Sequence, residues 1–229
     1  MMLLQIDKKS KIFFYLLILI FLSTINNFSI SKIGQLTSKI KFIEVTGADE
    51  NFNLKIKKNL FFLINENIFF LKKRDIKREL EKYNYLESYR VLKIFPSKII
   101  IHIKHASLLG ITVRNNKKYY IGSNSKLIDF KDVDKQNYLP NVFGGFSTKD
   151  FLLLKKKINK TNFNNKIIKD YFFFPNKRWD LKTTDDLTIK LPKDNVENSL
   201  EKAIKIIENS KFNQYKIIDL RMPNQVILY

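Results

Sequence analysis

The chain has 229 residues, of which 45% are hydrophobic, and it contains no cysteine. It is long enough for one large or two small domains, and the lack of cysteine excludes a disulfide framework and thiolate chemistry. The formal net charge of +20 would suit a nucleic-acid-binding protein. However, the lysines are spread along the whole chain, so we interpret the charge as a compositional bias and predict no nucleic-acid partner.

The first predicted element is a membrane anchor at residues 12–30, after a short basic tail at residues 1–11. Eleven apolar residues run without a break from Ile12 to Leu22, and no charged residue follows until Lys32. The uncharged stretch is near the length of about 20 residues that a spanning helix needs. No small-residue cleavage site follows Leu22, which favours an uncleaved anchor over a signal peptide. Lysines before the stretch predict a cytoplasmic N-terminus and an exported remainder.

A linker at residues 31–39 leads to a predicted β-α-α-β-β domain at residues 40–106. The segment 40–48 alternates apolar and polar residues and ends at a glycine turn, which is typical of a strand. Two helical apolar patterns follow, and then two strand-like segments meet at Pro96-Ser97. This order predicts a small α/β sandwich with two helices on one face of a sheet.

Residues 107–229 form the second predicted domain, a mostly antiparallel sheet with two helices against it. A hairpin is expected around Asn115-Asn116, and a second hairpin around residues 184–186. The stretch LPNVFGG, 139–145, is interpreted as a loop because of its proline and glycine pair. Asp194 and Glu197 have the spacing of a capping box before the second helix. Residues 216–229 are expected to form one terminal strand.

Five stretches of the chain carry a resemblance to a known family. In chain order they are IKFIEVTGA, NIFFLKKRDIKRELEKYNYLESYRVLKIFPSKIIIHI, YLPNVFG, NKRWDLKTTDDLTIKLP and IIDLRMPNQVIL. In this order and spacing they resemble the FtsQ/DivIB cell-division proteins over nearly the whole chain. The resemblance implies an α+β fold made of an N-terminal transmembrane helix, a POTRA domain and a mostly antiparallel β domain with flanking helices.

The resemblance also implies a non-catalytic divisome scaffold in the inner membrane at the division septum. Its single anchor would leave the N-terminus in the cytoplasm and the domains in the periplasm. The implied partners are FtsB and FtsL and, through them, the septal peptidoglycan synthase pair of FtsW/FtsI type, with no cofactor, metal or small-molecule substrate. In the family, a segment of FtsB pairs alongside the C-terminal strand. The residues expected at this contact are Arg178, Trp179, Arg221, Met222, Asn224, Gln225, Val226, Ile227, Leu228 and Tyr229.

Two other functions remain open from the sequence. A POTRA-bearing accessory protein could chaperone exported chains during envelope assembly, and a secreted protein of this charge could bind polyanions. Catalytic motifs are weak: His102 and His105 are three residues apart in a predicted strand and so point to opposite faces, which rules out a shared metal. Asp185 and Asp186 occupy a predicted turn, where acidic residues are common for structural reasons.

Overall fold

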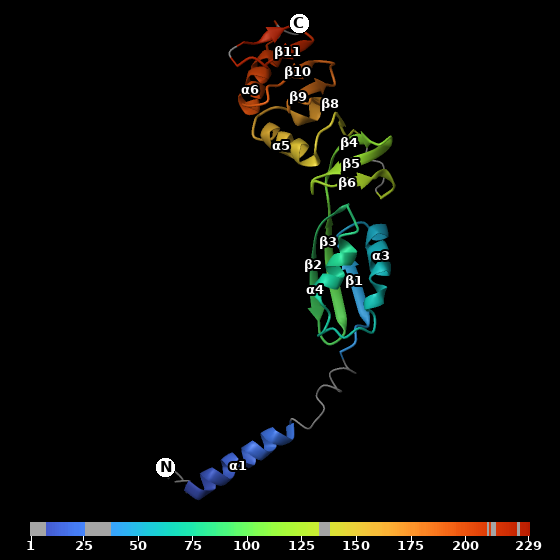
Figure 1. Cartoon of the computed structure of the whole chain (residues 1–229), viewed down its shortest axis with the longest axis vertical. Coiled ribbons are helices and arrows are strands. Elements are labelled where there is room, and N and C mark those ends of the chain that lie inside the picture. Colours follow the sequence, from blue (N-terminus) through green and yellow to red (C-terminus); the bar gives the residue numbers. More distant parts are fainter. Residues whose placement is uncertain (1–7, 26–37, 133–137, 210, 212–213, 224) are drawn as a thin grey trace. The chain divides into compact units, whose positions relative to one another are not determined.

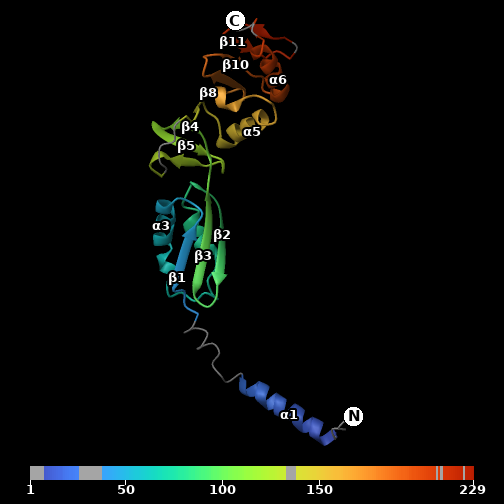
Figure 2. The same ribbon diagram turned by 180° about the vertical axis from the view of Figure 1, so that it is seen from behind.

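The computed structural model describes residues 8–25, 38–132, 138–209, 211, 214–223 and 225–229. Contacts group the chain into two compact units, which Figures 1 and 2 show from opposite sides. The first unit comprises Met1–Glu79 and Arg90–His102, and the second comprises Leu80–Tyr89 and Ile103–Tyr229. The division at residue 107 that the sequence suggests stays a prediction.

The helix α1 (Lys8–Ile25) covers most of the segment predicted as an anchor. The side chains from Ile12 to Leu22 along it are exposed. Within the part of the chain that the structure describes, no helix is both long enough and apolar enough to span a bilayer. Residues 26–30 of the predicted span, and most of the predicted linker, lie outside the described residues.

The predicted β-α-α-β-β order is confirmed. The elements are β1 (Phe42–Thr46), α3 (Glu50–Asn59), the 3₁₀ turn η1 (Phe61–Leu63), α4 (Lys73–Leu80), β2 (Leu86–Ile94) and β3 (Lys98–His105). The sheet has the order β1-β3-β2, so the first strand enters beside the last, and β1 and β3 are parallel. α3 begins where the Asp49 carboxylate accepts a hydrogen bond from the Phe52 N–H, as expected for a helix N-cap.

Both helices of this domain cover one face of the three-stranded sheet (Figure 1). In β1, Ile43 and Val45 are buried while Phe42 is exposed, which follows the alternation expected for a strand with one covered face. The helices contribute further buried apolar residues, among them Ile56 and Ile76. The apolar periodicity of the sequence therefore identified the core-facing positions of this domain.

The remaining strands form a nine-stranded sheet of order β12-β11-β10-β9-β8-β7-β4-β5-β6. The strands are β4 (Leu108–Arg114), β5 (Lys117–Gly122), β6 (Leu127–Asp129), β7 (Asn141–Phe143), β8 (Ile168–Phe173), β9 (Trp179–Thr183), β10 (Thr188–Lys190), β11 (Ile217–Asp219) and β12 (Ile227–Leu228). Neighbours pair antiparallel except β4–β7, β7–β8 and β10–β11, so the sheet is mixed. The short 3₁₀ turns η2 (Phe130–Asp132) and η3 (Asn165–Ile167) follow β6 and precede β8.

Two segments of this sheet differ from the sequence-based expectation. Asn141–Phe143 was predicted to lie in a loop, but it is the strand β7, and it pairs with both β4 and β8 near the middle of the sheet. The last residues were predicted to form one strand, but they form β11 and β12, which run antiparallel to each other. Pro223, which has no N–H to donate to a ladder, lies between them.

The helices α5 (Thr148–Ile158) and α6 (Val196–Ile207) bury their apolar stripes in the same core as this sheet. α5 starts with a capping box, in which Ser147 and Asp150 bond each other's backbone N–H groups. The capping box predicted for α6 is wrong, because its N-cap is Asn195, in the left-handed region at φ 56°, with no side-chain cap.

Candidate functional site

The C-terminal end of the nine-stranded sheet, formed by β9 to β12, has two chemically distinct faces. Leu181, Ile189 and Ile218 are paired neighbours along the sheet, and all three belong to the core under the helices. The adjacent residues in each strand point to the opposite face, because side chains alternate along a strand. This opposite face carries charge.

The charged face is organised by strand register. Lys190 in β10 pairs with Asp180 in β9 on one side and with Asp219 in β11 on the other, so the three form a row across the sheet. The row is continued by Phe172 in β8 and by Ile227 in β12, which pair with Asp180 and Asp219 respectively. We call Asp180, Lys190 and Asp219 the charged row.

Arg221 pairs with the outer aspartate of the charged row. Its Nε donates to both carboxylate oxygens of Asp219, at 2.8 and 3.0 Å, and its Nη2 donates to Oδ2 at 2.5 Å. The Arg221 guanidinium bonded to Asp219 holds the pKa of that carboxyl below its ordinary value. Arg221 was expected at the partner contact, and an acidic group of a partner would have to compete there with this ion pair inside the chain.

Arg178 and Asp180 make a looser pair at the other end of the row. Arg178 Nε lies 3.6 Å from Asp180 Oδ1, and both atoms are buried with no hydrogen-bond partner in the part of the chain that the structure describes. Burial raises the pKa of the Asp180 carboxyl, and the charges of Arg178 and Lys190 offset this only in part. Arg178 also stacks on Phe174, with its Cζ 4.3 Å from the ring centroid. An acceptor and a donor are thus left unsatisfied beside the charged row.

The strand β12 forms the edge of the sheet beside this row. The N–H of Tyr229 donates to Ile217 O and the N–H of Ile217 donates to Tyr229 O, each at 3.1 Å. Hydrogen-bonded pairs alternate along an antiparallel ladder, so the backbone groups of Ile227 also face β11. By the same alternation, the N–H and C=O of Val226 and Leu228 turn toward the open edge. Lys190 Nζ lies 6.0 Å from the Tyr229 ring centroid, which joins the charged row to this edge.

An open groove lies between the start of α6 and the segment that follows β11. Its lining is mostly polar, and it includes Lys193, Glu201, Lys205 and Arg221. Lys202 Nζ donates to Pro223 O at 3.3 Å, which ties this segment to α6.

Most of the predicted contact residues are accessible. Met222 and Tyr229 are 55% and 60% exposed, and Val226 and Ile227 are 39% and 37% exposed. Gln225 is also exposed, Leu228 is half-buried against the core, and Asn224 lies outside the described residues.

Trp179 corrects the expectation for this contact. It is 6% exposed and packs against Phe173 and Phe146, with ring centroids at 4.8 and 5.7 Å. Its side chain is part of the core, because position 179 points to the helix-covered face together with Leu181. It is therefore not a surface contact.

Sequence reasoning missed Asp180, Lys190 and Asp219. The signal was present, because each is the polar residue between apolar neighbours in WDL, IKL and IDL. What the sequence lacked was the register that places the three strands side by side.

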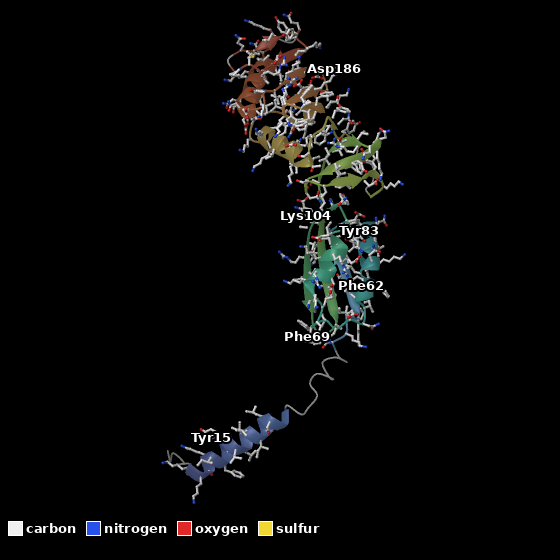
Figure 3. The ribbon with its side chains drawn as sticks, in the orientation of Figure 1. Tyr15, Phe62, Phe69, Tyr83, Lys104 and Asp186 are labelled. Carbon is white, nitrogen blue, oxygen red and sulfur yellow. The ribbon has the colours of Figure 1, made fainter. Side chains whose placement is uncertain are left out.

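Figure 3 labels Asp186 in the turn between β9 and β10, where Lys182 Nζ lies 3.1 Å from its Oδ1, so that this acid is held in a structural ion pair. Within the described ranges, no three His, Asp or Glu side chains gather as metal ligands would.

Two family models match this chain. A POTRA domain of FtsQ type matches residues 38–104, and the C-terminal domain of the cell division protein FtsQ/DivIB matches residues 111–221. The chain belongs to the FtsQ/DivIB family of cell-division proteins. The first of these matches covers the β1-to-β3 sandwich, and the second runs from within β4 to the end of β11, so that it includes the charged row but not β12.

Individual family members are similar over most of the chain. Cell division protein FtsQ of Rickettsia typhi is 28% identical over 213 residues, which is 86% of this chain and 76% of the relative. FtsQ of Rickettsia prowazekii is 29% identical over 213 residues, 86% of this chain and 75% of the relative. Cell division protein DivIB of Clostridium tetani is 30% identical over 127 residues, 53% of this chain and 48% of the relative.

Proposed function

We propose that this FtsQ/DivIB-family protein is a non-catalytic divisome scaffold that binds FtsB by β-strand addition to β12. FtsB would bring FtsL, and the pair would connect the scaffold to the FtsW/FtsI-type septal peptidoglycan synthase. The observation that carries the proposal is the edge position of β12, whose residues Val226–Tyr229 include no charge and no proline. Such an edge offers unpaired backbone N–H and C=O groups to an added strand, and most proteins block their edge strands for this reason.

The neighbouring groups would supply specificity to the added strand. Backbone bonds would form with the outward N–H and C=O groups of Val226 and Leu228, and alternate side chains of the partner would reach the exposed face. Arg178 and Lys190 would favour an acidic side chain nearby. The groove beside α6 offers room for the part of the partner that precedes or follows the strand.

The proposal includes a membrane anchor formed by α1. Its exposed apolar side chains run from Ile12 to Leu22, and Lys8, Lys9 and Lys11 precede them. Insertion would cover these side chains, while the lysines would stay on the cytoplasmic side. The two domains would then act in the periplasm at the septum, with the POTRA domain at about residues 40–106 and the β domain at 107–229.

Binding of the purified full-length chain to a synthetic FtsB segment tests the proposal. We expect saturable binding, together with new hydrogen-exchange protection at Val226 and Leu228. A matched segment with a proline in its pairing region should not bind. Saturable binding that leaves the exchange of β12 unchanged would overturn the strand-addition mechanism, and absence of any binding would overturn the partner assignment.

A further inference from the structure

The end of the POTRA domain where the chain enters exposes a group of phenylalanines. Phe69, Phe70 and Phe95 are 59%, 73% and 54% exposed, and Phe69 stacks on Phe95 with ring centroids 4.7 Å apart. Figure 3 shows Phe69 at this end of the domain. We call Phe69, Phe70 and Phe95 the aromatic tip. Neighbouring large apolar side chains left in water are unusual for a small domain and indicate a binding surface.

The aromatic tip is held in place by its own hydrogen bonds. Lys93 Nζ donates to Ile68 O at 2.8 Å and to Leu71 O at 3.0 Å, which fixes both ends of the turn that carries Phe69 and Phe70. The Asn67 side chain accepts from the Phe69 N–H at 2.9 Å. The rings are thus presented on an ordered turn, so binding through them would cost little ordering entropy.

The chain enters the domain directly beside this turn. Ile68 N–H donates to Ser38 O at 2.9 Å, Ile40 N–H donates to Glu66 O at 2.9 Å, and Lys41 N–H donates to Ser97 O at 2.8 Å. The entering segment is therefore bonded both to the turn that carries Phe69 and to the turn that follows Phe95.

Exposed lysines surround the aromatic tip. Lys39 and Lys41 lie on the entering segment, and Lys72 and Lys73 follow the phenylalanine turn; all four are exposed. Glu66 contributes an opposing charge on the same turn. Aromatic and basic side chains in this combination are typical of protein surfaces that lie in the interface of an anionic bilayer.

From this we propose that the aromatic tip inserts into the headgroup region of an anionic lipid bilayer and holds the POTRA domain against the membrane surface. The inference rests on the anchoring of α1 proposed above. Twelve residues, 26–37, separate α1 from Ser38, and fully extended they would span at most about 40 Å. With α1 in the bilayer, a tether of this length allows the tip to reach the lipid headgroups. The phenylalanines would enter the interface, and the four lysines would contact lipid phosphates.

Single cysteine labels in the full-length chain, reconstituted into lipid vesicles, test the inference. The native sequence has no cysteine, so one introduced thiol takes the whole label. An environment-sensitive fluorophore is placed at F70C for the tip. The matched control is E50C, which follows β1 at the end of the domain away from Phe42. A third label at L19C reports on α1. Vesicles contain phosphatidylcholine with or without phosphatidylglycerol, and spin-labelled lipids quench either near the headgroups or at the bilayer centre.

We expect the tip label to shift to shorter wavelength and to lose most of its emission to the headgroup quencher, while the control label changes little. Lys72→Glu together with Lys73→Glu should reduce quenching of the tip label in vesicles with phosphatidylglycerol, and should leave the L19C signal unchanged.

A tip label quenched no more than the control overturns the inference and leaves a protein partner as the alternative occupant. If L19C is not quenched at the bilayer centre, the anchor proposal fails. The tip label still decides the inference about the tip in that case.

Discussion

The two edges of the nine-stranded sheet, β6 and β12, are protected in different ways. β6 carries Asp129, whose carboxylate bonds Lys117 Nζ at 2.5 Å, and this interaction lowers the pKa of Asp129. The chain then turns back so that Phe130 stacks on Tyr120, with ring centroids 4.1 Å apart. β12 has no such feature among Val226–Tyr229, where the side chains are large, apolar and partly exposed.

This difference indicates which edge is available for pairing. Charged residues and a chain that folds back are common means by which proteins prevent another strand from adding to a sheet. The presence of such protection at β6 shows that this chain can protect an edge, so the lack of it at Val226–Tyr229 indicates that the β12 edge is available for pairing. We therefore expect partner binding to respond to changes at β12 and to ignore equivalent changes at β6.

Removal of Val226–Tyr229 should have the largest effect. β12 contributes two paired residues to the sheet and lies at its edge, so the nine-stranded sheet should lose this strand and retain the core around Trp179. We expect binding to the FtsB segment to be abolished, measured by titration calorimetry. Circular dichroism serves as the folding control. If the truncated chain is folded and binds as well as the intact chain, β12 is not the docking edge.

Val226→Lys should transfer the protection seen at β6 to β12. A lysine ammonium beside an arriving strand would lose part of its hydration, so we expect binding to weaken by about 2 kcal/mol. Leu153→Lys is the matched control, because Leu153 is also an exposed apolar residue but lies on α5. Equal loss of affinity in both variants would indicate a general charge effect rather than a blocked edge.

Replacing the Leu228 amide by an ester should separate the outer side of β12 from the inner side. The ester keeps the side chain and removes the N–H that faces the open edge, so binding should weaken by about 1 kcal/mol, the usual contribution of one hydrogen bond. The same replacement at Ile227 removes an N–H that faces β11, and should lower the melting temperature more than it lowers affinity. Binding affinity and thermal unfolding of both proteins are measured; the reverse pattern would show that the assigned alternation is wrong.

The smallest effects are expected in the pH dependence of unfolding. The pKa of Asp219 is lowered in the fold, so its stabilising contribution is present at neutral pH and is lost as the pH falls below the ordinary aspartate range. The pKa of Asp180 is raised, so its ionisation destabilises the fold as the pH rises from the ordinary range through the raised value. Between pH 7 and pH 3, the melting temperature of Asp219→Asn should therefore fall less than that of the unaltered chain, and the melting temperature of Asp180→Asn should fall more. Parallel profiles for both variants would contradict the assigned shifts.

The POTRA domain was predictable from sequence because its elements are long enough to show their period. α3 and α4 carry apolar residues at helical spacing, and β1 alternates strictly, so element order and core faces followed directly. The sheet pairing between β1 and β3 joins residues about 55 positions apart, as in Val45 with Ile101. Local periodicity does not determine such pairings, although the need to cover one face with both helices restricts them.

The β domain was less predictable because its strands are short. β7 has three residues between Pro140 and Gly144, so its turn-forming neighbours outweighed its own strand propensity. The terminal segment reads as a single strand, although Pro223 interrupts it. For the site, most residues expected at the contact near the C-terminus are accessible, and their role in binding stays a prediction, while Trp179 was expected at the contact although it is in the core. The charged row could not be predicted, because it exists only once β9, β10 and β11 are in register.

The order of β10, β11 and β12 has a consequence for quality control during biogenesis. β10 and β11 are parallel and are connected through α6, so β11 can dock only after a long crossover has closed. In the described part of the sheet, β12 pairs with β11 alone, so it joins the sheet together with β11 or after it. Non-local pairings of this kind form slowly. If β12 is the docking edge, a chain in which β11 has not yet joined the sheet would not present it, and a partner that binds this edge would select folded molecules.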